Sequence, residues 1–324
     1  MRRREFIALI GGVTIWPFAA RAQQSGKLWR LGYVGTGGIG DQLLQAFTQK
    51  LEALGHLQGK SVVVSRVNVL PEAKTIEFAI TRLLPDSDIL VVWGTLGGAV
   101  AKRVNSSIPT VFLSVGAPVD IGLVQSLSRP GGNMTGVTFE AATETYAKRL
   151  QMLKEVVPTF ERIAVLAAQG DPNVEFALKS LEKAASAMNV ALTTVYVETA
   201  DDLPTAFDQI ERNRVSGLIV IAGILTAINA KTIAELSLAH RLPSCHGFRE
   251  TVLAGGLISL GPDLLAIARQ GAVYVDKIIK GAKPADLPIE QPDRYEIYIN
   301  LKTAKTLGLE IPAHLLAGAD KVIE

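Results

Sequence analysis

The stretch that decides the fold class is Leu28–Val34, with the sequence LWRLGYV. The glycine-rich segment Gly35-Thr36-Gly37-Gly38-Ile39-Gly40 follows it, and a helical pattern then runs from Gln42 to Leu54. A short apolar run that is closed by glycines and followed by a longer periodic segment is typical of the start of a βαβ unit. Further strands are expected at 61–67, 88–92 and 110–113, with helices at 73–84 and 99–104. We therefore predict a parallel sheet covered by helices.

A second series of the same kind follows a turn-rich break at 129–133, which is expected to end the first series. Its expected strands are 162–167, 191–197, 217–222 and 242–245, with helices at 145–156, 174–188, 201–212 and 228–240. The tail adds strands at 257–260 and 295–300 and helices at 264–279 and 303–307. Two tandem series predict an α/β protein with two Rossmann-like lobes, and a returning tail predicts a multi-strand hinge between them.

The first 22 residues have the features of an export signal. Arg2-Arg3-Arg4-Glu5-Phe6-Ile7 is basic, the stretch Ile7–Ala20 is uncharged, and Ala20-Arg21-Ala22 is a small-x-small cleavage site. We expect cleavage after Ala22, periplasmic localisation and, from the twin arginine, the export route for folded proteins. The alternative is an N-terminal membrane anchor, but the apolar run is short for a bilayer span.

Composition narrows the classes of partner. Residues 1–22 carry four arginines and one glutamate, so the formal charge falls from +2 for the whole chain to −1 without them. No basic stripe remains for nucleic acid or anionic lipid. The single cysteine, Cys245, excludes an intramolecular disulfide, and the four histidines show no metal-ligand spacing. About 300 remaining residues are enough for two domains.

Two local patterns raise the question of an enzyme. Gly35, Gly37 and Gly40 form a GxGxxG, but a dinucleotide site needs an acidic residue after the second strand, where this chain has Ser65-Arg66. The other interpretation is a glycine-rich turn that lets a ligand approach helix N-terminal amides. Cys245 and His246 are adjacent on a strand and so point to opposite faces, which predicts a buried Cys245 and a His246 at the edge of the cleft. The chain also lacks a GxSxG motif. We expect no cofactor, no metal and no catalysis.

Candidate ligand contacts lie at the carboxyl ends of the expected strands, where α/β sheets bind ligands. The first lobe offers Thr36, Trp93, Gly94, Thr95, Ser114 and Val115. The second lobe offers Gln169, Asp171, Gly223, His246, Phe248, Arg249 and Glu250. Hydroxyl groups beside backbone amides suit a carboxylate, and Phe248 suits the apolar body of a ligand. Arg249 and Glu250 fit either a charged end of the ligand or a surface ion pair.

Four longer segments carry a family resemblance. They are VQSLSRPGGNMTG at 124–136, AGGLISLGP at 254–262, the stretch 274–292 that begins YVDKIIKGAKPADLP, and INLKTAKTLGL at 299–309. Together they resemble the ABC transporter substrate-binding family that includes the tryptophan-binding, TrpX-like proteins. The resemblance implies a type I periplasmic-binding fold with a three-strand hinge. It also implies delivery of a small molecule to an ABC permease in the inner membrane. A periplasmic receptor that feeds a sensor system is the alternative.

The chain departs from its relatives in the second lobe. Amino-acid-binding members place an acidic residue after the strand at 217–221, where this chain has Ala222-Gly223-Ile224-Leu225, and Ala168-Gln169 replaces a common tryptophan–asparagine pair. We expect a small carboxylate-type ligand, either an amino acid or an aromatic or branched acid, and hypothesise one without an amine. The expected lobes are 28–137 with about 260–292, and 138–259. Residues 293–324 form a hinge strand and closing helix whose lobe is left open. A monomer is expected.

Overall fold

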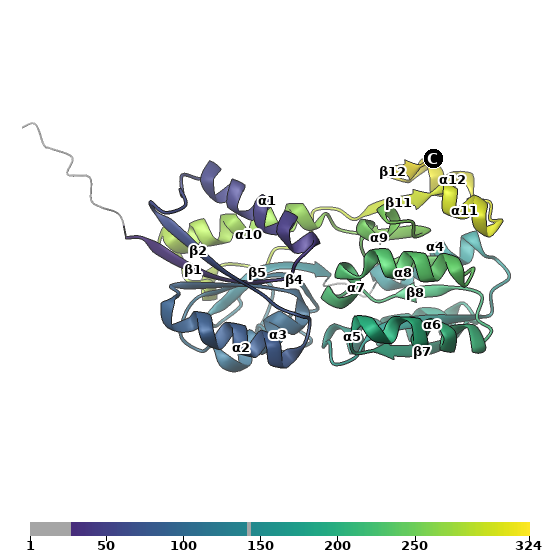
Figure 1. Ribbon diagram of the computed structural model, residues 1–324, viewed down its shortest axis with the longest axis horizontal. Helices are drawn as coiled ribbons and strands as arrows, with labels where there is room; N and C mark the ends of the chain where they lie inside the picture. The colour runs from purple at the N-terminus through teal and green to yellow at the C-terminus, as the bar shows by residue number, and fades with distance from the viewer. Residues whose placement is uncertain (1–26, 141–143) are drawn as a thin grey trace, which may run out of the picture.

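The computed structural model describes residues 27–140 and 144–324 and has two α/β lobes side by side (Figure 1). The expected export signal at residues 1–22 lies outside the described residues. Within the described ranges, no helix combines the length and the apolar character that a membrane span requires. One lobe is built on a five-stranded sheet and the other on a seven-stranded sheet. The predicted two-lobed α/β architecture is confirmed.

The first sheet is parallel throughout, in the order β2-β1-β3-β4-β5. Its strands are β1 (Trp29–Gly35), β2 (Val62–Asn68), β3 (Ile89–Trp93), β4 (Thr110–Gly116) and β5 (Met134–Glu140). Every residue of β3, β4 and β5 is buried, because helices cover both faces of the sheet.

Four helices cover the first sheet, and one of them comes from late in the chain. They are α1 (Ile39–Ala53), α2 (Ala73–Leu83), α3 (Gly94–Val104) and α10 (Leu264–Ile279). α1 and α10 share an apolar cluster with one face of the sheet, and α2 and α3 share another with the opposite face. α10 lies close to β4, since a Cβ at Gly271 would be 2.5 Å from a methyl carbon of Leu113.

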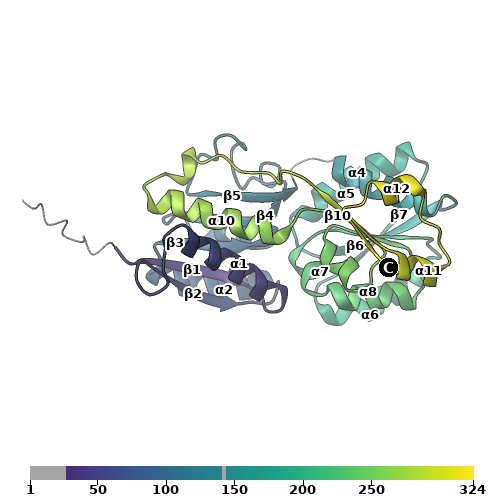
Figure 2. The same cartoon turned by 90° about the horizontal axis from the view of Figure 1, so that it is seen from above.

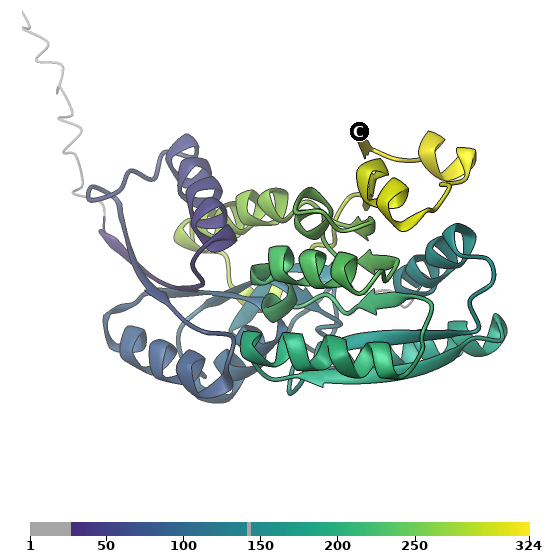
Figure 3. The ribbon, with the colours of Figure 1, turned by 45° about the vertical axis from the view of Figure 1, so that its right-hand side comes forward.

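The second sheet has the order β12-β11-β10-β9-β8-β6-β7 and is parallel except at the β10–β11 pair. Its strands are β6 (Arg162–Ala168), β7 (Ala191–Val197), β8 (Leu218–Val220), β9 (Ser244–His246), β10 (Ile258–Gly261), β11 (Glu296–Asn300) and β12 (Lys321–Ile323). The antiparallel β11 follows from the chain returning to this sheet after α10. Figure 3 shows the C-terminal elements, in yellow, on the second lobe.

The second sheet is also covered on both faces. Its helices are α4 (Glu144–Val156), α5 (Asn173–Ala187), α6 (Leu203–Arg212), α7 (Ile224–Ile228), α8 (Ala230–Ala239), α9 (Arg249–Leu253), α11 (Leu301–Leu307) and α12 (Ala313–Ala317). α4, α5, α11 and α12 contribute to one apolar cluster, and α6 and α8 contribute to another on the opposite face. Each lobe therefore has its own core.

Three chain segments cross between the lobes. The first leaves β5 at Glu140, the second joins β10 to α10, and the third runs from Glu290, which pairs with β5, to β11 (Figure 2). A fully buried ion pair joins Glu140 to Arg149 of α4 at 3.0 Å. Arg149 Nε also donates to the carbonyl oxygen of Leu260 at 2.9 Å, which ties the first crossing to the second.

Five helices and strands were not predicted from the sequence: β5, α7, α9, α12 and β12. β5 begins one residue after the turn-rich break that was expected to end the first series. In the sequence, the glycine at position 136 suggests a turn. In the structure, Gly136 lies inside β5 with φ 154°, and a Cβ at this position would lie 1.9 Å from the carbonyl oxygen of Phe112. The close approach of the β4 backbone at Phe112 therefore requires a glycine here. Because the surrounding residues are typical of turns, the sequence pattern did not indicate a strand.

Candidate functional site

A narrow cavity lies between the lobes, beyond the carboxyl ends of β1, β3, β4 and β8. Its volume is about 30 Å³, which holds on the order of one or two water molecules. Its wall is largely apolar, with hydroxyl groups on Tyr33, Thr36 and Ser114. The lining residues are Tyr33, Gly35, Thr36, Ile39, Gly40, Leu43, Trp93, Gly94, Ser114, Phe139, Gly223, Ile224, Ala227, Ile228, Phe248 and Leu264. The lobes are closed on each other here, so a larger ligand enters only if they separate.

Aromatic side chains make the first-lobe wall rigid. Trp93, the last residue of β3, donates its indole N–H to the hydroxyl of Tyr33 on β1. Tyr33 also packs against Phe47 of α1, with 5.6 Å between the ring centroids. Burial raises the pKa of Tyr33, so the phenol stays neutral.

Two left-handed residues shape the same wall. Gly94 begins α3 with φ 75°, and a Cβ there would lie 3.3 Å from Ile224 of the second lobe. Ser114 has φ 56° at the place where the register between β4 and β5 shifts. A left-handed residue other than glycine is strained, and such strain is concentrated at functional sites. The wall therefore combines the Ser114 hydroxyl with the first turn of α3, whose N–H groups have no partners within the helix.

The second-lobe wall is an apolar cover. Ile224, Ala227 and Ile228 of α7 line the cavity together with Phe248, which precedes α9. Phe248 packs edge-on against Phe139 of β5, with 5.5 Å between centroids and 64° between the ring planes. The cover thus contacts the first lobe through apolar side chains. Side chains of this kind favour a ligand with an apolar body.

A buried carboxyl group lies beside this cover, in the turn after β6. Asp171 is 7% exposed, and its Oδ1 accepts a hydrogen bond from the backbone N–H of Asn173 at 3.0 Å. Its Oδ2 lies 3.0 Å from where a Cβ of Gly223 would stand. Burial raises the pKa of Asp171 to about 6. Asp171 also borders a wider interlobe groove that includes Asp120 and Ile121 of the first lobe.

The structure brings together six of the residues predicted to contact ligand. These cavity-lining residues are Thr36, Trp93, Gly94, Ser114, Gly223 and Phe248. Thr95 and Val115 lie behind the wall, with Thr95 Oγ1 accepting a hydrogen bond from Gly116 N–H at 3.0 Å. Gln169 is exposed and lies outside the wall.

His246 lies inside the second lobe and not at the edge of the cleft. It is 1% exposed, and its Nε2 is 2.8 Å from the Ser244 hydroxyl. Burial lowers its pKa to about 3, which keeps the imidazole neutral. Cys245 is a buried free cysteine in the core, and burial raises its pKa to about 12. The two side chains form no pair for catalysis.

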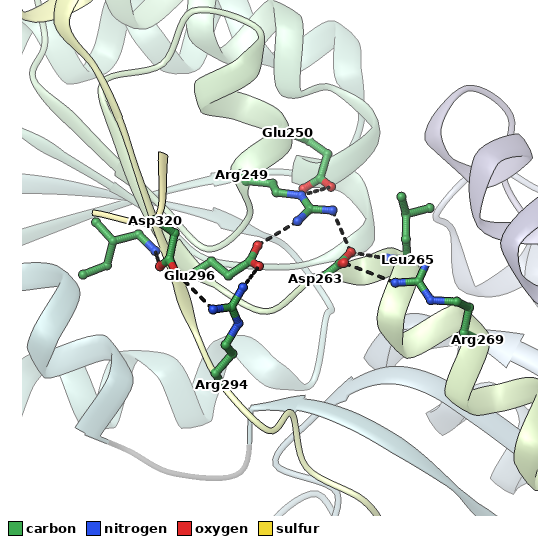
Figure 4. Close-up of polar contacts among 9 residues, drawn as sticks. Arg249, Glu250, Asp263, Leu265, Arg269, Arg294, Glu296 and Asp320 are labelled. Carbon is green, nitrogen blue, oxygen red and sulfur yellow. Dashed lines mark hydrogen bonds and ion pairs between the residues drawn. The ribbon is translucent and has the colours of Figure 1, made fainter. Parts of the chain in front are cut away.

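Arg249 and Glu250 belong to an ion-pair network at the hinge (Figure 4). Arg249 lies 2.7 Å from Asp263 and 2.7 Å from Glu296, and 3.8 Å from Glu250. The network continues through Arg269, Arg294 and Asp320. Asp263 caps α10 by accepting the N–H of Leu265, so the network joins the second lobe to the helix that covers the first. Arg249 is engaged by these acids and is absent from the cavity wall.

The glycine-rich segment lies where the sequence placed it, between β1 and α1. Gly35, Thr36 and Gly40 line the cavity, whereas Gly37 does not. Arg66, at the end of β2, is 2.6 Å from Asp41 of α1 and donates to the carbonyl oxygen of Thr36. The position that would need an acidic ribose ligand is therefore filled by an arginine that braces this turn.

One cluster in the described part of the chain has the composition of a metal site: Asp208, Glu211 and His240. His240 directs Nδ1 toward Glu211 at 2.8 Å and Nε2 toward Asp208 at 4.0 Å. One ligand atom from each residue lies within 4.8 Å of the other two, but exposed acidic groups commonly gather in this way without an ion. Both acids are exposed, and the cluster is explained as surface polar contacts.

Comparison with known proteins identifies the family. A model of the family described as "ABC transporter substrate binding protein" matches residues 40–323. The chain belongs to this family. Family and fold indicate a solute-binding protein and not an enzyme; substrate-binding proteins of ABC transporters bind a small-molecule ligand and a permease.

Individual relatives of this substrate-binding protein are distant. A tyrosine-binding protein of Clostridioides difficile is 22% identical over 83% of this chain and 77% of its own. Among solved structures, an ABC domain from Streptococcus pneumonia in complex with L-Trp has TM-score 0.84 and 20% identity, covering 92% of this chain and all of that one. A conserved domain protein from Vibrio cholerae has TM-score 0.85 and 22% identity, with 91% and 100% covered. The shared fold is that of type I periplasmic binding proteins.

Sequence reasoning missed several residues of the site. Tyr33, Phe139 and the α7 residues line the cavity but were not among the expected contacts. Phe139 was hidden because its strand, β5, was not predicted.

Proposed function

We propose that this substrate-binding protein works in the periplasm, where it captures a small carboxylate-type ligand between its lobes and delivers it to an ABC permease. The observation that carries the proposal is the interlobe cavity, with its apolar body, the Thr36 and Ser114 hydroxyls, and the start of α3. Helix N-termini favour anions. An amino acid and an aromatic or branched acid both fit this description.

The proposed mechanism is hinge closure. The sheets move the expected lobe bounds to the ends of β5 and β10, so that lobe one (28–140 with 262–292) and lobe two (144–261 with 293–324) move as rigid units about the three crossings. A ligand held by both walls favours closure only by its greater affinity for the closed state. The closed monomer then presents a surface formed by both lobes to the permease.

The proposal includes export. Residues 1–22 act as a cleavable signal, with the twin arginine selecting the route for folded proteins. Protein recovered from the periplasm is expected to begin at Gln23. Mature protein that retains the first 22 residues would contradict cleavage after Ala22.

Thermal unfolding against a ligand panel tests the binding function. The panel holds amino acids, aromatic acids, branched acids, sugars and nucleosides. A ligand at one hundred times its Kd adds about 2.7 kcal/mol to the free energy of unfolding, which raises the Tm by several degrees. We expect a rise with one or more carboxylates. A rise with sugars or nucleosides alone would contradict the proposed ligand class.

A further inference from the structure

A fully buried ion pair joins the two lobes at the first crossing. Glu140 and Arg149 approach to 3.0 Å, and both side chains are 0% exposed. The backbone of Glu140 belongs to the first sheet, where it pairs with Gly116 and where its carbonyl oxygen accepts the N–H of Ala117 at 2.7 Å. Arg149 belongs to α4, whose apolar residues are part of the core of the second lobe. The two charges of the pair are therefore carried by different lobes.

The same end of β5 is connected to the other two crossings. Arg149 Nε donates to the carbonyl oxygen of Leu260, near the end of β10, where the second crossing begins. Tyr295, on the third crossing, donates its hydroxyl to the carbonyl oxygen of Phe139 at 2.9 Å. Phe139 and Glu140 are adjacent, so contacts at two neighbouring residues reach all three crossings (Figure 2). Phe139 also lines the interlobe cavity.

The free energy of these contacts decides which of them breaks when the lobes separate. Parting Glu140 from Arg149 would leave two buried charges without partners, which is strongly unfavourable. The contact between Gly94 and Ile224 joins α3 to α7, which no crossing segment connects directly, and its loss leaves no charge unpaired. Rotation of the lobes should therefore open the cavity at Gly94 and keep Glu140 beside Arg149.

We propose that Glu140 and Arg149 form the fixed pivot of the hinge. The pair stays intact in the open and in the closed state and fixes the direction in which the lobes rotate. Arg149 is a positioning residue, because it acts through Glu140 and Leu260 on two crossings and is absent from the cavity wall. This inference rests on the hinge closure of the proposed function and specifies which contact between the lobes survives the motion.

Interlobe distances between two spin labels test the pivot. Lys74→Cys on α2 and Lys183→Cys on α5 place one label on an exposed position of each lobe, and Cys245 stays unlabelled because it is buried. Double electron–electron resonance then gives the distribution of distances without ligand. Glu140→Met combined with Arg149→Met removes both charges and keeps side chains of similar length, so this double variant should fold. We expect its distance distribution to be about twofold wider than that of the labelled parent, because a buried ion pair acts mainly by specifying one arrangement.

Two further variants separate the pivot from general loss of stability. His56→Phe with Asp276→Leu removes a buried contact of 2.8 Å inside lobe one and should leave the width of the distribution unchanged, even where urea unfolding shows lower stability. Tyr295→Phe removes only the hydroxyl that binds Phe139, and we expect a smaller broadening.

Equal widths in the labelled parent and in the double variant would overturn the inference and leave the proposed function intact. If the double variant does not fold, equal widths in the parent and in Tyr295→Phe would overturn it in the same way. The parent is also measured with each amino acid, aromatic acid and branched acid of the ligand panel. A single distance that none of these ligands changes would overturn the pivot and hinge closure together.

Discussion

At the scale of single residues, Asp171 illustrates a conflict between binding and stability. Its carboxyl group is buried beside the interlobe cavity without a charged partner among the described residues. A buried group with a strongly shifted pKa is typical of functional sites. The strained Ser114 and the left-handed Gly94 line the interlobe cavity near Asp171, so unfavourable local features are concentrated around this cavity.

This conflict predicts a pH dependence of stability. The folded state raises the pKa of Asp171 from 3.8 to about 6, so between these values the folded protein holds a proton that the unfolded chain releases. Stability therefore falls as pH rises through this window, by about 3 kcal/mol for a shift of this size. We expect Asp171→Asn, without ligand, to remove this loss, as measured by urea unfolding at pH 4 and pH 7.

The control for this prediction compares the variant with the unsubstituted protein at each pH. Asp120, Glu175 and Lys179 border the same groove, and Glu175 and Lys179 pair with each other at 2.7 Å. These groups are the same in both proteins, so their effects cancel in the difference. If the free energy of unfolding changed with pH in the same way for the variant and the unsubstituted protein, burial of the Asp171 carboxylate would not lower stability.

At the scale of elements, ion pairs hold the crossings between the lobes. Arg249, at the start of α9, joins the start of α10 to β11 through Asp263 and Glu296. The side chain of Arg249 is 16% exposed and that of Glu296 is 11% exposed, so solvent screens the network only in part. The network thus links elements that are distant in the chain but meet at the hinge.

Removal of the central arginine should destabilise this junction. Arg249→Met leaves Asp263 and Glu296 without their shared cation, which we expect to lower the free energy of unfolding by about 2 kcal/mol. Arg269→Met is the matched control, because Arg269 is 48% exposed and makes one contact at 3.4 Å with Asp263. The control should change stability by about 0.5 kcal/mol or less. Equal losses in urea unfolding would contradict a special role for Arg249.

At the scale of the whole molecule, the closed arrangement depends on close contact between the lobes. The cavity is far smaller than an amino acid, and Ile224 of the second lobe packs at Gly94 of the first. Binding therefore requires opening and reclosing, and the closed state depends on the space left by that glycine.

Gly94→Ala is expected to oppose closure. Its Cβ would meet Ile224 at 3.3 Å in the closed state, and φ 75° adds strain in either state. We expect ligand affinity to fall about tenfold, equivalent to about 1.4 kcal/mol. Small-angle scattering should show a larger radius of gyration with ligand than for the unsubstituted protein. Gly97→Ala on the same helix, where the nearest atom is 3.8 Å away, should close normally. A Gly94→Ala protein that closes as fully as Gly97→Ala would contradict this account.

The alternation of strands and helices and the fold class follow from the sequence, because apolar periodicity and glycine breaks act over a few residues. It also indicated the strand ends that build the first-lobe wall, including Trp93, Gly94 and Ser114. It did not reveal β5, since Gly136 satisfies a backbone contact with Phe112 that no local pattern records.

The strand ends that meet in space are set by the order of the strands in each sheet. Strand order places Asp171 beside Gly223, although 51 intervening residues separate them in the chain. The return of α10 to the first sheet brings Asp263 to Arg249 at the hinge and makes that arginine part of an ion-pair network. These pairings depend on packing between segments far apart in the chain, and the energy of such packing is set by the whole fold rather than by neighbouring residues.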